Sequence, residues 1–153
     1  MAAPEVELVL RKPSRRGPPT EQRVLATAHG AVLEIGGTPP SFNVTAGAHW
    51  TKHRKAKRDW QDWLGLAMMA KAVPRKLLRV EATARVQFPA ERRRDEGNFR
   101  VVLEKALGDV LVEGDWLPDD TPDRYTFGAV TIDAPMPVHQ TLVTLTYYKE
   151  ARR

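Results

Sequence analysis

Residues 91–120, ERRRDEGNFRVVLEKALGDVLVEGDWLPDD, decide the fold of this chain. Inside this stretch, apolar residues recur at the i, i+3, i+4, i+7 spacing of one face of an α-helix. They are Phe99, Val102, Leu103, Ala106, Leu107, Val110 and Leu111. Asp95 or Asn98 is suited to cap the helix at its start, and Gly114 stands where a left-handed C-terminal cap belongs. The stretch therefore predicts an amphipathic helix with one buried face.

Acidic clusters lie on both sides of this helix. Asp95 and Glu96 precede it, and Asp115, Asp119 and Asp120 follow it. Carboxylate oxygens are the ligands that Mg²⁺ prefers, and a bound Mg²⁺ is suited to phosphodiester chemistry. On the alternative interpretation the clusters are structural, a helix cap before the helix and a polar turn after it. The arginine run Arg92, Arg93 and Arg94 beside the first cluster is suited to hold phosphate.

Composition points to a basic globular protein. The chain has 153 residues, the size of one domain with a core of its own. It carries 24 Lys and Arg against 19 Asp and Glu, with a pI near 9.7. There is no cysteine, which excludes disulfides and thiolate metal sites. No apolar run approaches the ~20 residues of a membrane span, and no signal peptide is recognisable. These features predict a protein of the cytoplasm with no membrane contact.

A second helix is predicted over residues 50–71. Its core face consists of Trp60, Trp63, Leu64, Ala67 and Met68. The start of this helix is densely basic. Phosphate contact is predicted for Lys52, Arg54, Lys55, Lys57 and Arg58, because each neutralised phosphate releases counterions. A solvated basic face is the alternative.

Alternating apolar and polar residues predict strands at 23–35, 77–88, 125–132 and 141–148. Residues 1–23 are expected to be an N-terminal extension or flexible linker, with a short strand near its start, and residues 24–150 the folded domain. The order β-α-β-α-β-β predicts an α+β fold. We expect a small mixed or antiparallel sheet with two principal helices packed on it.

Over residues 32–148 the chain resembles the RusA-like Holliday-junction resolvases, which are common in bacteriophages and prophages. The resemblance begins with a strand that ends in Thr38-Pro39-Pro40-Ser41, a basic helix and a strand that ends in proline. It continues with the arginine-rich acidic turn, the helix with Ala106-Leu107, and the double aspartate. The last three pieces in this order are its most specific part.

The resemblance implies a RusA-like endodeoxyribonuclease that acts as a homodimer on branched DNA with Mg²⁺, in recombination, repair or phage DNA processing within a bacterial cell. The first Asp and the Asn of the family's acidic turn match Asp95 and Asn98, and the later carboxylate matches Asp120 with Asp119 before it. Asp95, Asn98 and Asp120 are thereby implied to be catalytic, and Asp95, Asp119 and Asp120 to be metal ligands. The implied DNA contacts are Arg92, Arg93, Arg94, Arg100, Lys52, Arg54, Lys55, Lys57 and Arg58.

Two positions depart from the family pattern. Gly97 stands where the family has a second Asp, and Val101 where it has a lysine. Glu96 and Arg100 are their neighbours, but one residue on a helix is a rotation of ~100°. The departures motivate an alternative in which the chain is a catalytically degenerate relative that binds DNA, or a host or phage protein, without cleavage.

Overall fold

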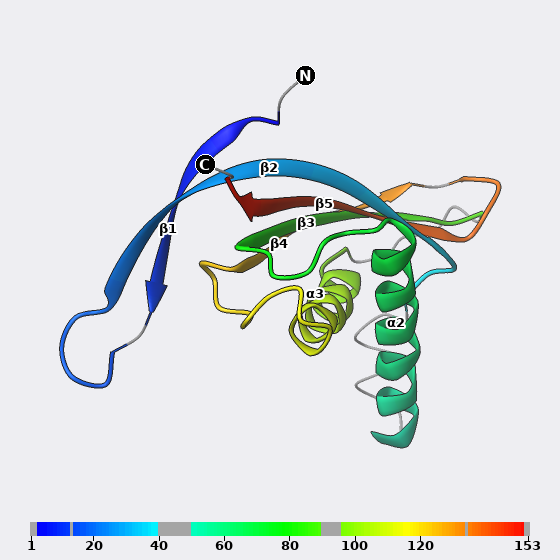
Figure 1. The fold of residues 1–153 in the computed structure, drawn as a ribbon. Helices are drawn as coiled ribbons and strands as arrows, with labels where there is room; N and C mark the ends of the chain where they lie inside the picture. The colour runs from blue at the N-terminus through cyan, green and yellow to red at the C-terminus, as the bar shows by residue number, and fades with distance from the viewer. Residues whose placement is uncertain (1–2, 13, 40–49, 90–95, 134, 152–153) are drawn as a thin grey trace.

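The chain folds into a curled five-stranded sheet with both of its long helices on one face (Figure 1). The computed structural model describes residues 3–12, 14–39, 50–89, 96–133 and 135–151, and at residues 50–53 and 96–98 it describes the backbone alone. The elements are β1 (Glu5–Lys12), β2 (Thr20–Gly36), α2 (Trp50–Ala70), β3 (Arg79–Gln87), α3 (Glu96–Glu113), β4 (Tyr125–Asp133) and β5 (Gln140–Glu150). The α+β class, with a mixed sheet and two helices packed on it, is confirmed.

The strand order β1-β2-β5-β3-β4 contains one parallel pair. Strands β3 and β4 run parallel, whereas β2 and β3 each pair antiparallel with β5. A parallel pair requires a crossover connection over one face of the sheet, and α3 is that crossover. The chain therefore leaves β3 at one end of the sheet and enters β4 at the other.

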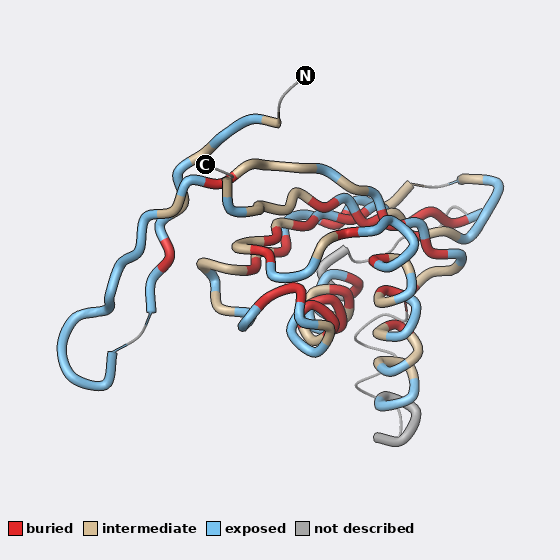
Figure 2. The backbone as a smooth tube through the Cα atoms, viewed as in Figure 1, coloured by how far each residue is buried: buried red, intermediate tan, exposed pale blue. Residues whose placement is uncertain are grey.

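The core fills the space between the sheet and the helices (Figure 2). Alternate residues of β3 and β5 point toward the helices, and each helix packs one apolar face against the sheet. The buried residues here include Val80, Ala82, Ala84, Val86, Val143, Leu145, Leu64, Met68, Leu103 and Leu107. The predicted core faces of α3 and β3 are thus confirmed. Trp63, expected in the core, is instead 44% exposed at the edge of α2, and it meets Trp60 edge to face.

The end of α3 departs from the expected glycine cap. The left-handed residue is Asp115, with φ of 63°, and not Gly114. The amide of Trp116 donates to the carbonyl of Leu111, which closes a Schellman turn. A Cβ on Gly114 would lie 2.2 Å from the Trp116 ring. Glycine is needed there because the indole folds back over the helix end.

The N-terminal region forms a hairpin arm. Strand β1 pairs antiparallel with the first half of β2, from Glu5 opposite Thr27 to Lys12 opposite Thr20. β2 then continues without interruption to Gly36, paired with β5. Within residues 1–23, which were expected to be an extension or linker, Glu5–Lys12 and the start of β2 are therefore part of the sheet, and β2 passes residue 23 without a break. Figure 1 shows the arm extending beyond the rest of the sheet.

Packing at the core of α2 is expected to dominate stability. Leu64 is 0% exposed, whereas Leu66 on the same helix is 64% exposed. Leu64→Ala should lower the free energy of unfolding by about 2–5 kcal/mol, because it removes buried methyl groups and leaves a cavity. Leu66→Ala is the matched control and should change it by less than about 0.5 kcal/mol. Urea unfolding of both variants checks this, and similar losses in both would contradict the assignment of the core face.

Candidate functional site

A cleft of about 530 Å³ lies between α3 and the start of β4. Its lining residues are Arg100, Val101, Glu104, Lys105, Asp120, Pro122, Tyr125, Thr126 and Phe127. Cations and carboxylates of α3 thus share one hollow with Asp120 of the acidic loop. The sequence pointed to Asp120 and Arg100, but not to Glu104, Lys105 or Tyr125. The missed signal was the polar face of α3, where Glu104 follows Arg100 at helical spacing.

Asp120 lies against the middle of α3 because α3 carries a glycine there. A Cβ on Gly108 would lie 3.0 Å from the Tyr125 ring and 3.7 Å from Oδ2 of Asp120. The first of these contacts is tighter than ordinary packing. Gly108 therefore allows β4 and the acidic loop to approach the helix, and brings the Asp120 carboxylate to the cleft.

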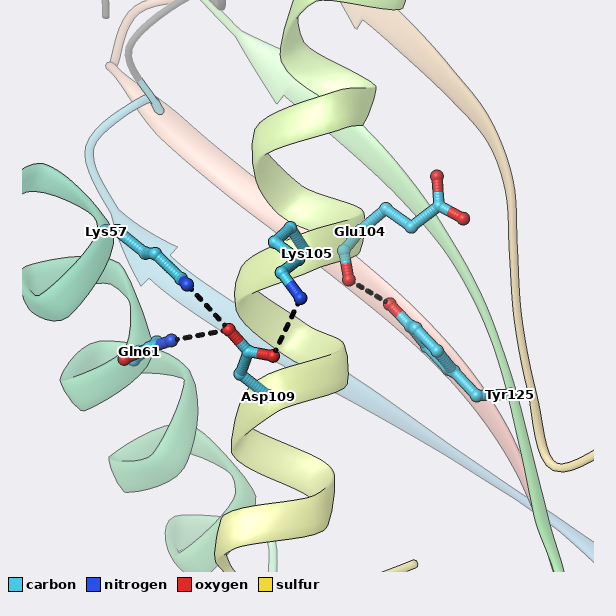
Figure 3. A network of polar contacts seen from close by, with 6 residues as sticks. All are labelled: Lys57, Gln61, Glu104, Lys105, Asp109 and Tyr125. Atoms are coloured by element: carbon cyan, nitrogen blue, oxygen red, sulfur yellow. Dashed lines mark hydrogen bonds and ion pairs between the residues drawn. The ribbon is translucent and has the colours of Figure 1, made fainter. Parts of the chain in front are cut away.

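Tyr125 ties the two walls of the cleft together. Its buried ring ends in a hydroxyl that donates to the backbone carbonyl of Glu104 at 2.7 Å (Figure 3). Burial raises the pKa of Tyr125, and the nearby carboxylates of Glu104, Asp120 and Asp109 raise it further. The hydroxyl is thus held in its protonated form and serves as a fixed donor, not as a proton acceptor.

Arg100 is held in the cleft by contacts with Phe127 and Glu104, while part of its side chain stays exposed. Its Nη2 donates to the carbonyl of Phe127 at 3.0 Å, and its Nε lies 3.7 Å from Glu104. The side chain is 48% exposed. A guanidinium has five N–H donors, so these two contacts leave donors for a phosphate.

The Asp119 side chain is hydrogen-bonded within the turn before β4. Oδ1 of Asp119 accepts from the amide of Thr121 at 3.0 Å and from its hydroxyl at 2.6 Å. Partial burial acts to raise the pKa of Asp119, but the Thr121 hydrogen bonds and the charge of Arg124 outweigh it, and the net pKa is lowered. These contacts make Asp119 a turn residue, the structural alternative for this position.

The entrance of α3 and Asp120 lie far apart. Gly108, which marks the level of Asp120, is twelve residues after the first helical residue, Glu96. At ~1.5 Å per residue this is about 18 Å along the helix axis. Across the described part of the chain, no group of three or more His, Asp or Glu is arranged to hold a metal ion.

Several predicted site residues lie outside the described residues. These are Arg92, Arg93, Arg94 and Asp95, together with the side chains of Asn98 and Lys52. The Thr38–Ser41 motif is described only through Pro39. Arg54, Lys55 and Arg58 are described, and all three are exposed on α2.

Lys57 is paired within the protein. Its Nζ lies 2.9 Å from Oδ2 of Asp109, and Gln61 donates to the same oxygen at 3.1 Å. Lys105 approaches the other oxygen at 3.4 Å (Figure 3). Burial acts to raise the pKa of Asp109, but the hydrogen bonds and charges of Lys57 and Lys105 outweigh it and lower the pKa. Asp109 thus links α2 to α3 beside the cleft.

The sequence matches no known protein-family model and no curated protein. The family resemblance accordingly stays an interpretation of the motifs. Among the helices that the structure describes, none is long and apolar enough to cross a membrane.

The link through Asp109 should make stability depend on pH. Its lowered pKa means that the ionised form stabilises the fold above the ordinary value of 3.8, and that this contribution disappears as the pH falls through the lower folded value. Asp109→Asn should therefore lower the free energy of unfolding by about 1–2 kcal/mol at pH 7. The difference from wild type should shrink as the pH falls below 3.8 and through the lower folded pKa of Asp109.

Glu113→Gln removes an exposed charge from the same helix and is the matched control. Urea unfolding from pH 2.5 to pH 7 measures both variants. An Asp109→Asn effect that persists unchanged at the acid end would contradict the ionic link.

Proposed function

We propose that this protein binds branched DNA and cleaves it with Mg²⁺ at the cleft between α3 and β4, in the manner of the RusA-like resolvases. The observation that carries the proposal is the composition of the cleft. Asp120 and Glu104 line it together with Arg100 and Lys105. Carboxylates beside cations are what phosphodiester cleavage requires, since one set holds a metal and the other holds phosphate.

The cations have the task of positioning the DNA backbone. Arg100 and Lys105 lie in the cleft, and Arg54, Lys55 and Arg58 extend the positive surface along α2. Contacts with phosphate carry no sequence information. They suit a protein that recognises the shape of a junction and not its sequence.

Among the described residues, Asp120 and Glu104 are the ones that would hold Mg²⁺. Their carboxylates line one cleft, and Mg²⁺ is commonly held by one or two carboxylates plus water and substrate phosphates. When bound, the ion neutralises phosphate charge and activates a water molecule. Tyr125 keeps its proton and holds the walls together, so it has no part in proton transfer. The predicted ligand Asp95 belongs to the same proposal, but lies outside the described residues.

Asp120→Asn should lower Mg²⁺-dependent cleavage of a synthetic four-way junction by about 100-fold or more, because it removes a ligand charge. Asp119→Asn is the matched control, one residue away, and should cost less than about tenfold, since its carboxylate serves the turn. Single-turnover cleavage on a gel measures both. Equal losses in the two variants would argue against a special role for Asp120.

Binding without cleavage is the second candidate. It is favoured by the distance of about 18 Å between the α3 entrance and the level of Asp120. The replacements at Gly97 and Val101 point the same way. A junction that is bound tightly yet stays intact with Mg²⁺ and Mn²⁺ across pH 6–9 would establish this candidate and exclude the first.

Val101 offers a gain-of-function test. It is 48% exposed and lines the cleft, at the position where the resemblance implies a lysine. Val101→Lys should tighten junction binding and steepen the slope of log K against log[salt] by about 0.9, the value for one added phosphate contact. Val112→Lys is the control, because Val112 is an exposed valine of α3 outside the cleft. Fluorescence anisotropy measures both, and no difference between them would contradict DNA binding in the cleft.

A further inference from the structure

We propose that the tip of the β1–β2 hairpin, formed by Lys12 and residues 14–20, is a second DNA contact that holds a duplex segment by its phosphates. The inference rests on the DNA binding proposed above and adds a separate surface to it. The arm extends beyond the rest of the sheet (Figure 1), and its tip is exposed throughout its described residues (Figure 2).

Charge is distributed unevenly along the arm. Below the tip, cations are matched by carboxylates, since Arg11 pairs with Glu21 at 3.3 Å and Arg23 with Glu7 at 3.2 Å. The tip sequence KPSRRGPPT contains Lys12, Arg15 and Arg16 and no acidic residue. In the described parts of the chain, none of these three side chains has a carboxylate partner. The positive charge that has no carboxylate partner on the described part of the arm is thus concentrated at the tip.

The turn at the tip is preorganised. The Ser14 hydroxyl donates to the carbonyl of Arg16 at 3.0 Å and accepts from the amide of Arg16 at 3.3 Å. Gly17 has φ of 106°, a conformation that favours glycine, and Pro18 and Pro19 restrict the return to β2. Presenting the two arginines in a fixed turn lowers the entropy lost on binding.

The end of β1 that leads into the tip lies beside the acidic loop. The backbone amide of Arg11 donates to Oδ2 of Asp123 at 2.8 Å, and Asp123 is three residues after Asp120. Arg79 of β3 donates to the Asp123 carbonyl at 3.4 Å. One DNA molecule therefore meets both surfaces if it enters the cleft and continues past the loop.

The chemistry of the tip favours duplex phosphate over other anionic partners. Residues 12–20 contain no aromatic side chain on which an unpaired base could stack. They also lack the large apolar side chains that insert into a membrane surface. The tip is accordingly a phosphate contact that is independent of base sequence.

The test replaces the three tip cations together, as Lys12→Gln, Arg15→Gln and Arg16→Gln. The matched control, Lys71→Gln, Lys76→Gln and Lys149→Gln, removes the same charge away from the tip; two of its lysines lie in surface ion pairs of small energetic weight. Affinity for a linear duplex and for a four-way junction is measured by anisotropy at several salt concentrations. Junction cleavage is measured on the same preparations.

The tip variant should bind duplex at least about tenfold more weakly, and its salt slope should fall by about 2.7, at ~0.9 for each lost phosphate contact. The control variant should retain most of the wild-type duplex affinity and most of the salt slope. Equal affinities and slopes in the two variants would overturn the tip contact, whatever the cleavage result. If the tip variant loses duplex affinity but the wild-type chain cleaves no junction, the tip contact is supported and the proposed nuclease activity is rejected.

Discussion

The parallel pairing of β3 with β4 is the constraint on which the rest of the structure depends. Antiparallel neighbours can be joined by a short turn, but parallel neighbours need a crossover. Here α3 spans that distance across one face of the sheet. Its apolar stripe closes the core against β3 and β5, while its polar face is left beside β4. The cleft at that polar face is thus a by-product of the connection that completes the sheet.

The same connection decides which acidic residues lie near one another. A crossover helix begins at one end of the sheet and finishes near the other, so the entrance of α3 and the residues directly after it are separated by most of the helix length. The loop after α3 then turns back, and Gly108 allows Asp120 and Tyr125 to lie against the middle of the helix. Asp120 consequently shares a cleft with Glu104, which lies one helical turn before Gly108.

The described carboxylates of this region divide by function. Asp109 links the two helices through Lys57 and Lys105, Asp115 pairs with Lys76, and Asp119 closes a turn on Thr121. In the part of the chain that the structure describes, the Asp120 carboxylate forms no ion pair, and Asp120 lines the cleft. A carboxylate that forms no ion pair within the fold is the one best able to bind a metal ion. For this reason the functional proposal rests on Asp120 and not on Asp119.

The sequence by itself determined the α+β class, the core stripe of α3 and the inward face of β3, because helix and strand periods depend on local geometry alone. The sequence pattern was wrong at Trp63, which has the helical spacing of a core residue but is 44% exposed. The sequence pattern also placed the start of the folded domain after residue 23, which lies inside the long strand β2. The pairing of β1 with β2 that extends this strand is not a local property. Only the tertiary structure decided the cleft, because the meeting of Asp120 with Glu104 depends on the parallel crossover and on the close approach at Gly108. The position of the basic arm beside Asp123 was likewise decided by long-range pairing, which no single stretch of sequence encodes.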